Sequence, residues 1–204
     1  GNTYLSSKDS SGVYVRGGGN NATNQIAVHD ADVNNFIEVT SATTRFSGDI
    51  TIKGETAMPK FFARRTVDVN NISSNTWTDI VFNGEIFDIG SDFNTSNGIY
   101  TAPVTGYYHF DWQVRFNNIP TGVQYIWTAL LTTDDQILAG LTRTDAIINT
   151  SSTISYWQKG GSVLCLLAAG DTAKVQVKIQ NDSTVDIDGA SSNFQTWFSG
   201  YLTV

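Results

Sequence analysis

The 204-residue chain has very little of several residues that whole classes of protein depend on. It contains one cysteine, so no disulfide can form within it, and only two histidines. It has no apolar run long enough to cross a membrane as a helix. Charged residues make up 15% of the chain, and their acidic excess gives a formal net charge of −7. Such a surface repels nucleic acid and anionic lipid, so we expect neither nucleic-acid binding nor membrane insertion.

The residues that are abundant favour strands over helices. Gly, Asn, Ser, Thr and aromatic residues are frequent, whereas Lys, Glu and Leu-rich helical patterns are scarce, and this balance is typical of an all-β protein. Cys165 lies within the apolar run VLCLL, where we expect a buried apolar side chain. The chain opens on Gly1 without Met, so we expect it to be part of a longer protein.

The clearest local pattern is in residues 100–116, which read YTAPVTGYYHFDWQVRF. A turn at 101–106 is followed by large apolar residues at alternate positions, with mostly polar residues between them. The alternating apolar residues are Tyr108, Phe110, Trp112, Val114 and Phe116. A period of two predicts a half-buried strand whose aromatic side chains enter the core.

This segment resembles the globular head of complement component 1q and its tumour-necrosis-factor-like relatives. In that family an aromatic residue precedes a glycine, and further aromatic residues follow at alternate positions. The matching residues here are Tyr100, Gly106, Tyr108, Phe110 and Trp112. Further matches occur in the family's order at 62–63, 161–171 and 198–202. The resemblance covers residues 60–204 and implies a ten-stranded jelly-roll sandwich that assembles as a tight trimer.

The chain changes character near Met58. Residues 1–58 carry short apolar patches separated by turn-rich polar runs, and a single chain of this polarity cannot bury enough apolar surface to fold alone. They resemble the stems of phage tail fibres, which end in phrases such as SGDITI, here 47–52. We therefore expect a short intertwined trimeric β stem over 1–58 and a jelly-roll head over 59–204. A disordered linker is the alternative for the first part.

The sequence gives little support for catalysis. His109 and Asp111 are two residues apart on one strand face, and a surface serine could complete a triad on paper. No nucleophile elbow accompanies them, so solvated strand residues are the simpler interpretation. The adjacent Asp134 and Asp135 suit a turn better than the carboxylate pair of a glycosidase. We expect no enzyme and no catalytic residues.

One acidic segment raises the question of a metal. Residues 180–193 contain Asp182, Asp186 and Asp188, whose hard oxygen ligands would suit calcium. The EF-hand spacing is absent, and Asp188-Gly189 is also an ordinary turn dipeptide. We expect no cofactor, with calcium as the open alternative.

The order of the parts predicts the tip of a fibre. The resemblance implies that both termini of the head lie at its base, so that 180–193, 117–122 and the region around Lys159 lie at the far end. Loops on a rigid scaffold are where recognition usually resides. The candidate ligand-binding residues are Asn117, Asn118, Tyr156, Trp157, Lys159, Asp182, Asp186, Asp188 and Asn193.

We therefore expect a homotrimeric, extracellular adhesin, carried by a virion tail fibre or by a phage-like bacterial surface fibre. Its partner would be a bacterial surface glycan or an outer-membrane protein, and weak sites would gain from threefold avidity. An inert trimerisation cap and a capsule-degrading enzyme are the alternatives.

Overall fold

The computed structural model describes residues 51–52, 55–56, 58–138, 142–143 and 152–203, and every regular element among them is a strand. No helix in these ranges has the length and hydropathy needed to span a bilayer. The predicted stem falls outside the described residues, apart from Met58 and the antiparallel pair β1 (Thr51–Ile52) and β2 (Glu55–Thr56). The stem and its boundary with the head remain predictions.

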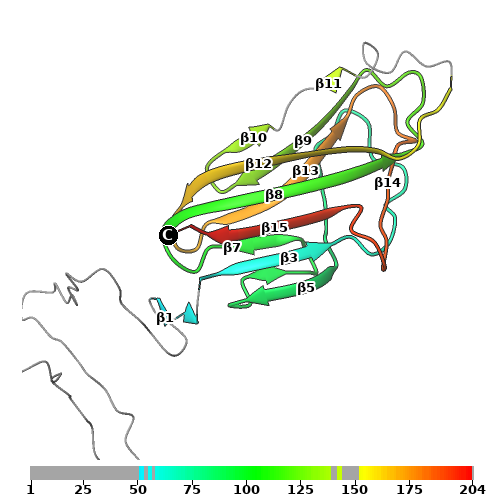
Figure 1. Ribbon diagram of the computed structural model, residues 1–204. Coiled ribbons are helices and arrows are strands. Elements are labelled where there is room, and N and C mark those ends of the chain that lie inside the picture. The colour runs from blue at the N-terminus through cyan, green and yellow to red at the C-terminus, as the bar shows by residue number, and fades with distance from the viewer. Residues whose placement is uncertain (1–50, 53–54, 57, 139–141, 144–151, 204) are drawn as a thin grey trace, which may run out of the picture. The chain divides into compact units, whose positions relative to one another are not determined.

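The head is a sandwich of two antiparallel sheets (Figure 1). The first, called the β8 sheet, has the order β12 (Trp157–Leu167), β8 (Gly106–Asn117), β15 (Trp197–Leu202), β3 (Lys60–Arg64), β5 (Gly84–Ile89), with β14 (Asp186–Ile187) beside β8. The second, called the β9 sheet, has the order β10 (Gln136–Leu138), β9 (Tyr125–Thr132), β13 (Thr172–Ile179), β7 (Ile99–Thr101), β6 (Phe93–Asn94). The short strands β11 (Thr142–Arg143) and β4 (Thr78–Asp79) lie beside β9 and β13.

This arrangement confirms the predicted fold. Each sheet has a main path of five strands, which gives the ten strands of a jelly roll, and the three short strands β4, β11 and β14 are additions to it. The alternation read from residues 107–116 is also confirmed, because Tyr108, Phe110 and Trp112 are at most 2% exposed.

Aromatic rings join the two sheets in the core. Phe61 from β3 stacks on Phe93 from β6 and on Tyr100 from β7, with ring centroids 4.7 and 4.9 Å apart. Phe198 from β15 meets Phe61 edge-on at 4.9 Å. Gly200 makes room for this cluster, since a Cβ there would lie 2.5 Å from the ring of Phe110. The core thereby holds the two sheets in a fixed relation.

The sandwich has two distinct ends. At the base end the amide of Leu202 donates to the carbonyl of Pro59 (2.9 Å), so the first and last residues of the head are neighbours. β8 then runs 12 residues to Asn117, which spans about 36 Å at the usual rise of a strand. At this distal end Asp186 pairs with Asn117. The predicted placement of 117–122 and 180–193 opposite the base is confirmed (Figure 1).

Candidate functional site

The distal end brings together six of the residues that the sequence suggested. Asn117 ends β8, Asp186 pairs with it from β14, and the side-chain Nδ2 of Asn118 donates to the Asp186 carboxylate. On the other side of β8, Trp157 begins β12 and pairs with Phe116. The remaining members of this group are Tyr156 and Asp188, which meet at Arg115.

Arg115 is the residue at this end that sequence reasoning missed. Its Nε donates to Oδ2 of Asp188 at 2.8 Å, and its guanidinium carbon lies 4.6 Å from the centroid of the Tyr156 ring. Asp188 is only 6% exposed, so its charge is largely removed from water and needs this partner. Arg115 had looked like one more polar residue of an alternating strand, and no sequence signal sets it apart.

The two neighbouring aromatic residues differ in their surroundings. The Trp157 ring is half-buried and packs against the core, with its centroid 6.1 Å from that of Phe116. Tyr156 is 65% exposed, which makes it the available aromatic surface of the pair. The predicted role of Trp157 in binding stays a prediction.

The acidic segment 180–193 is more ordered than a simple loop. β14 interrupts it, and Ile187 is fully buried. The Asp186 carboxylate accepts hydrogen bonds from the amide of Asn71 (2.8 Å) and from Asn118. Asp182 accepts from the backbone and hydroxyl of Thr184, both at 2.6 Å.

These contacts do not fit the proposed calcium site. Asp182, Asp186 and Asp188 each engage a different donor of the chain, whereas calcium needs several oxygen atoms that converge on one point. Within the part of the chain that the structure describes, no three His, Cys, Asp or Glu side chains are placed to hold a metal ion.

Two other predicted residues lie on segments that continue from this group. Lys159 is a strand residue of β12 and does not belong to a loop; it pairs with Val114, three residues before the distal end of β8, and its role in binding stays a prediction. Partial burial lowers the pKa of the Lys159 ammonium. Asn193 is exposed and lies in the segment that leads to β15.

The middle of the β8 sheet carries a short polar relay on its outer face. Nδ1 of His109 lies 3.1 Å from the Asp111 carboxylate, as the sequence suggested, and Nε2 of His109 lies 3.1 Å from the hydroxyl of Ser162. Ser162 pairs directly with Asp111 inside the β12–β8 ladder. A serine in a flat ladder is not presented on the sharp turn that exposes the nucleophile of an α/β-hydrolase. The Tyr201 ring stands beside His109, with centroids 5.2 Å apart.

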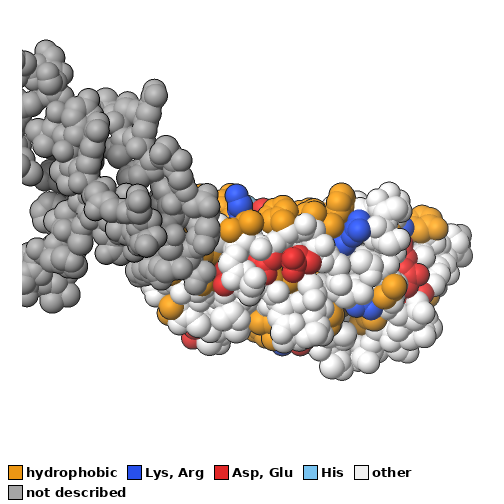
Figure 2. Space-filling view, turned by 90° about the horizontal axis from the view of Figure 1, so that it is seen from below, with side chains coloured by type: hydrophobic (Ala, Val, Ile, Leu, Met, Phe, Trp, Pro, Cys, Tyr) orange, Lys and Arg blue, Asp and Glu red, His pale blue; other side chains and the backbone are white. Residues whose placement is uncertain are grey.

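The same outer face is apolar toward the base end. Five large side chains on it are between 43% and 60% exposed, namely Tyr107, Leu164, Leu166, Tyr201 and Phe87. The strand register places them on one face, since Leu166 pairs with Tyr107. We call this set the apolar face. In Figure 2, hydrophobic side chains gather along the upper border of the head, next to a group of acidic side chains.

The fold and these surfaces together define an all-β jelly-roll domain, with polar loops at one end and an apolar sheet face. The sequence profile described as C1q domain matches residues 60–203, well over half of the chain. The chain therefore belongs to the C1q domain family, as the resemblance suggested. Domains of this kind are typically extracellular, non-enzymatic binding domains that commonly form homotrimers.

Two solved structures agree with this fold, and a third falls below a TM-score of 0.5. The globular domain of zebrafish complement 1qA protein is 17% identical, with a TM-score of 0.51, and the match covers 72% of this chain and 98% of that one. Eiger TNF from S. frugiperda is 11% identical, with a TM-score of 0.50, and the match covers 72% of this chain and 93% of that one. Murine APRIL is 12% identical with a TM-score of 0.47, over 72% and 99% of the two chains. A search of the curated proteins gives no match.

Proposed function

We propose that this chain is the receptor-binding tip of a trimeric fibre, a non-enzymatic adhesin that recognises a bacterial surface glycan or outer-membrane protein. The observation that carries the proposal is the position of the polar loops. They lie at the distal end, whereas Pro59 and Leu202 meet at the base end. Whatever precedes the head enters at the base, so the distal loops are the part that a target meets first.

The apolar face supports assembly into a homotrimer. A group of exposed large apolar side chains on one sheet face is typical of a protein–protein interface, whereas exposed apolar residues that are scattered singly are ordinary. The polar relay of Ser162, His109 and Asp111 would lie within the same interface. In a closed trimer each copy presents its distal end in the same direction, so that three weak sites act together.

The composition of the distal end supports recognition through hydrogen bonds and aromatic contact. Asn118 and Asn193 are exposed amides, and Tyr156 is an exposed aromatic ring. The net charge of −7 argues against a purely electrostatic grip on an anionic cell envelope. The predicted stem places the head on a virion tail fibre or on a phage-like bacterial fibre.

A pair of matched substitutions tests this function. Gly122 lies in the distal loop 117–122, and a Cβ added there meets nothing within 4 Å, so a side chain can start there and Gly122→Arg adds bulk and charge to the loop. Ala169 is an exposed residue of the turn between β12 and β13 at the base end. We measure binding of the trimer to a panel of bacterial cells. Gly122→Arg should weaken this binding about tenfold, whereas Ala169→Arg should bind within about twofold of the parent. Equal effects of the two substitutions would place recognition elsewhere.

The Ser162–His109–Asp111 relay favours one alternative, a hydrolytic enzyme. Release of reducing ends or ester acids from host polysaccharide, lost in Ser162→Ala, would support it. A trimer that binds no cell and cleaves no polysaccharide would instead be a structural cap.

A further inference from the structure

Tyr156 stands out among the residues with unusual backbone geometry. Six described residues other than glycine have a positive φ, namely Asn71, Asn75, Ser91, Asn118, Tyr156 and Asn181. Asparagine tolerates this left-handed conformation because its short side chain bonds to the nearby backbone. A large aromatic residue has no such compensation, and Tyr156 nevertheless adopts a φ of 64°. Conformations of this kind persist where the surroundings hold them, and they gather at binding sites.

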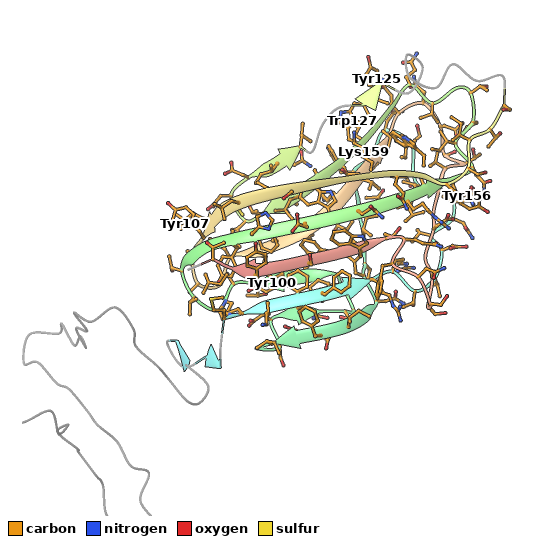
Figure 3. The ribbon with its side chains drawn as sticks, viewed as in Figure 1. Tyr100, Tyr107, Tyr125, Trp127, Tyr156 and Lys159 are labelled. Atoms are coloured by element: carbon orange, nitrogen blue, oxygen red, sulfur yellow. The ribbon has the colours of Figure 1, made fainter. Side chains whose placement is uncertain are left out.

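The surroundings that hold Tyr156 are charged and fixed. Its ring lies over the Arg115 guanidinium at 4.6 Å, the geometry of a cation–π contact. Arg115 is anchored in turn by Asp188, which is nearly buried. The ring is thus supported from below while 65% of the residue stays in contact with water. Figure 3 shows Tyr156 near one end of the β8 sheet and Tyr107 near the other.

From this geometry we infer that Tyr156 is a stacking platform for a neutral pyranose residue of the glycan; the inference rests on the proposed function. One face of a pyranose ring is lined with C–H groups, and it buries apolar area against an aromatic ring held in place beforehand. Asp188 already neutralises Arg115, so the platform offers no uncompensated cation to an acidic sugar. Asn118 is exposed at the same distal end, but its side-chain amide already donates to Asp186, so the platform is argued from the ring alone.

The test compares three variants of the full chain on purified surface polysaccharide from a bacterium that the parent binds. Tyr156→Ala removes the ring and should weaken binding about tenfold or more, whereas Tyr156→Phe keeps the ring and should stay within about threefold. Leu138→Ala is the matched control, because Leu138 is an apolar residue of similar exposure (54%) on the β9 sheet. It should leave binding unchanged, and all three variants should keep the oligomeric mass of the parent.

The outcomes separate this inference from the function beneath it. A parent that binds neither cells nor polysaccharide overturns both. The parent could bind cells only before protease treatment of the cell surface and show no binding to polysaccharide. That outcome overturns the sugar platform and supports an adhesin that binds a protein. Equal binding by Tyr156→Ala and the parent also overturns the platform. A fall in the oligomeric mass of Tyr156→Ala would make Tyr156 a subunit contact instead.

Discussion

The outer faces of the two sheets differ although their sequences begin from the same pattern. β9 and β12 both carry apolar residues on two faces, so each leaves an apolar surface outside the core. On the β9 sheet the chain itself covers part of this surface, because Trp127 stacks on Tyr125 (5.2 Å) and lies under the ammonium of Lys178 (5.7 Å), and Leu138 is a large apolar residue that stays exposed there. On the β8 sheet, Leu164 and Leu166 remain exposed.

This difference between the two outer faces indicates which sheet we expect to pack against another copy of the chain. Long side chains such as lysine can cover apolar area with their methylene stems while their charge stays in water. The residues that pair with the outer positions of β9 are of this kind, Lys174 and Lys178. The outer positions of β12 pair instead with Tyr107 and His109, which cannot cover it in the same way. A second copy of the chain is the proposed cover.

The largest effect should come from a charge placed on the apolar face. Leu164→Asp buries a carboxylate in the proposed interface, so we expect the trimer to fall apart into monomers at micromolar concentration. Leu138→Asp makes the same change at a leucine of nearly equal exposure on the β9 sheet and should leave the trimer whole. Light scattering measures both masses. A parent that is itself monomeric would refute the assembly, and trimers in both variants would refute the assigned face.

The next largest effect should be a loss of stability when a residue of the core between the two sheets is truncated. Trp112→Ala leaves a cavity and should lower the free energy of unfolding by about 3 to 5 kcal/mol. Trp112→Phe should be far milder, because the indole N–H of Trp112 is buried without a hydrogen-bond partner and its removal relieves that defect. Denaturant unfolding measures both. An unchanged midpoint for Trp112→Ala together with lost cell binding would show that Trp112 contacts the ligand.

Loss of an ion pair should cost more stability on the β8 sheet than on the β9 sheet. Asp188→Asn weakens a pair whose side chains are 9% and 20% exposed, and should destabilise the head by about 1 to 3 kcal/mol. Asp79→Asn affects the pair with Lys174 on the β9 sheet, whose side chains are 43% and 24% exposed, and should change stability by less than about 1 kcal/mol. Thermal unfolding in low and high salt compares them; equal losses would mean that Asp188 is better hydrated than its burial indicates.

The smallest effect is expected from a chelator. Because Asp182, Asp186 and Asp188 face separate donors of the chain, EDTA should change neither the unfolding midpoint nor cell binding. A clear loss of binding that calcium restores would show that the distal segment rearranges around a metal.

Much of the fold was predictable because it depends on local alternation. Tyr108, Phe110 and Trp112 alternate with polar residues, and a strand can place such a pattern in only one way with the aromatic side chains buried. The distal position of 117–122 came from the family resemblance, and the structure bears it out. The resemblance did not show that Lys159 and the two glycines after it lie inside the strand β12, because strand ends depend on pairing with β8.

The sequence alone determined the strands that enter the core, the acidic surface and the polar character of the distal segments, since these follow from residue type and local spacing. Tertiary structure decided which distant residues meet. Arg115, Tyr156 and Asp188 come from three separate segments, and only the pairing of β8 with β12 and β14 brings them to one point. The register of β12 against β8 also places Ser162 within hydrogen-bond distance of His109. Such contacts depend on packing across the sheets, which no local pattern records.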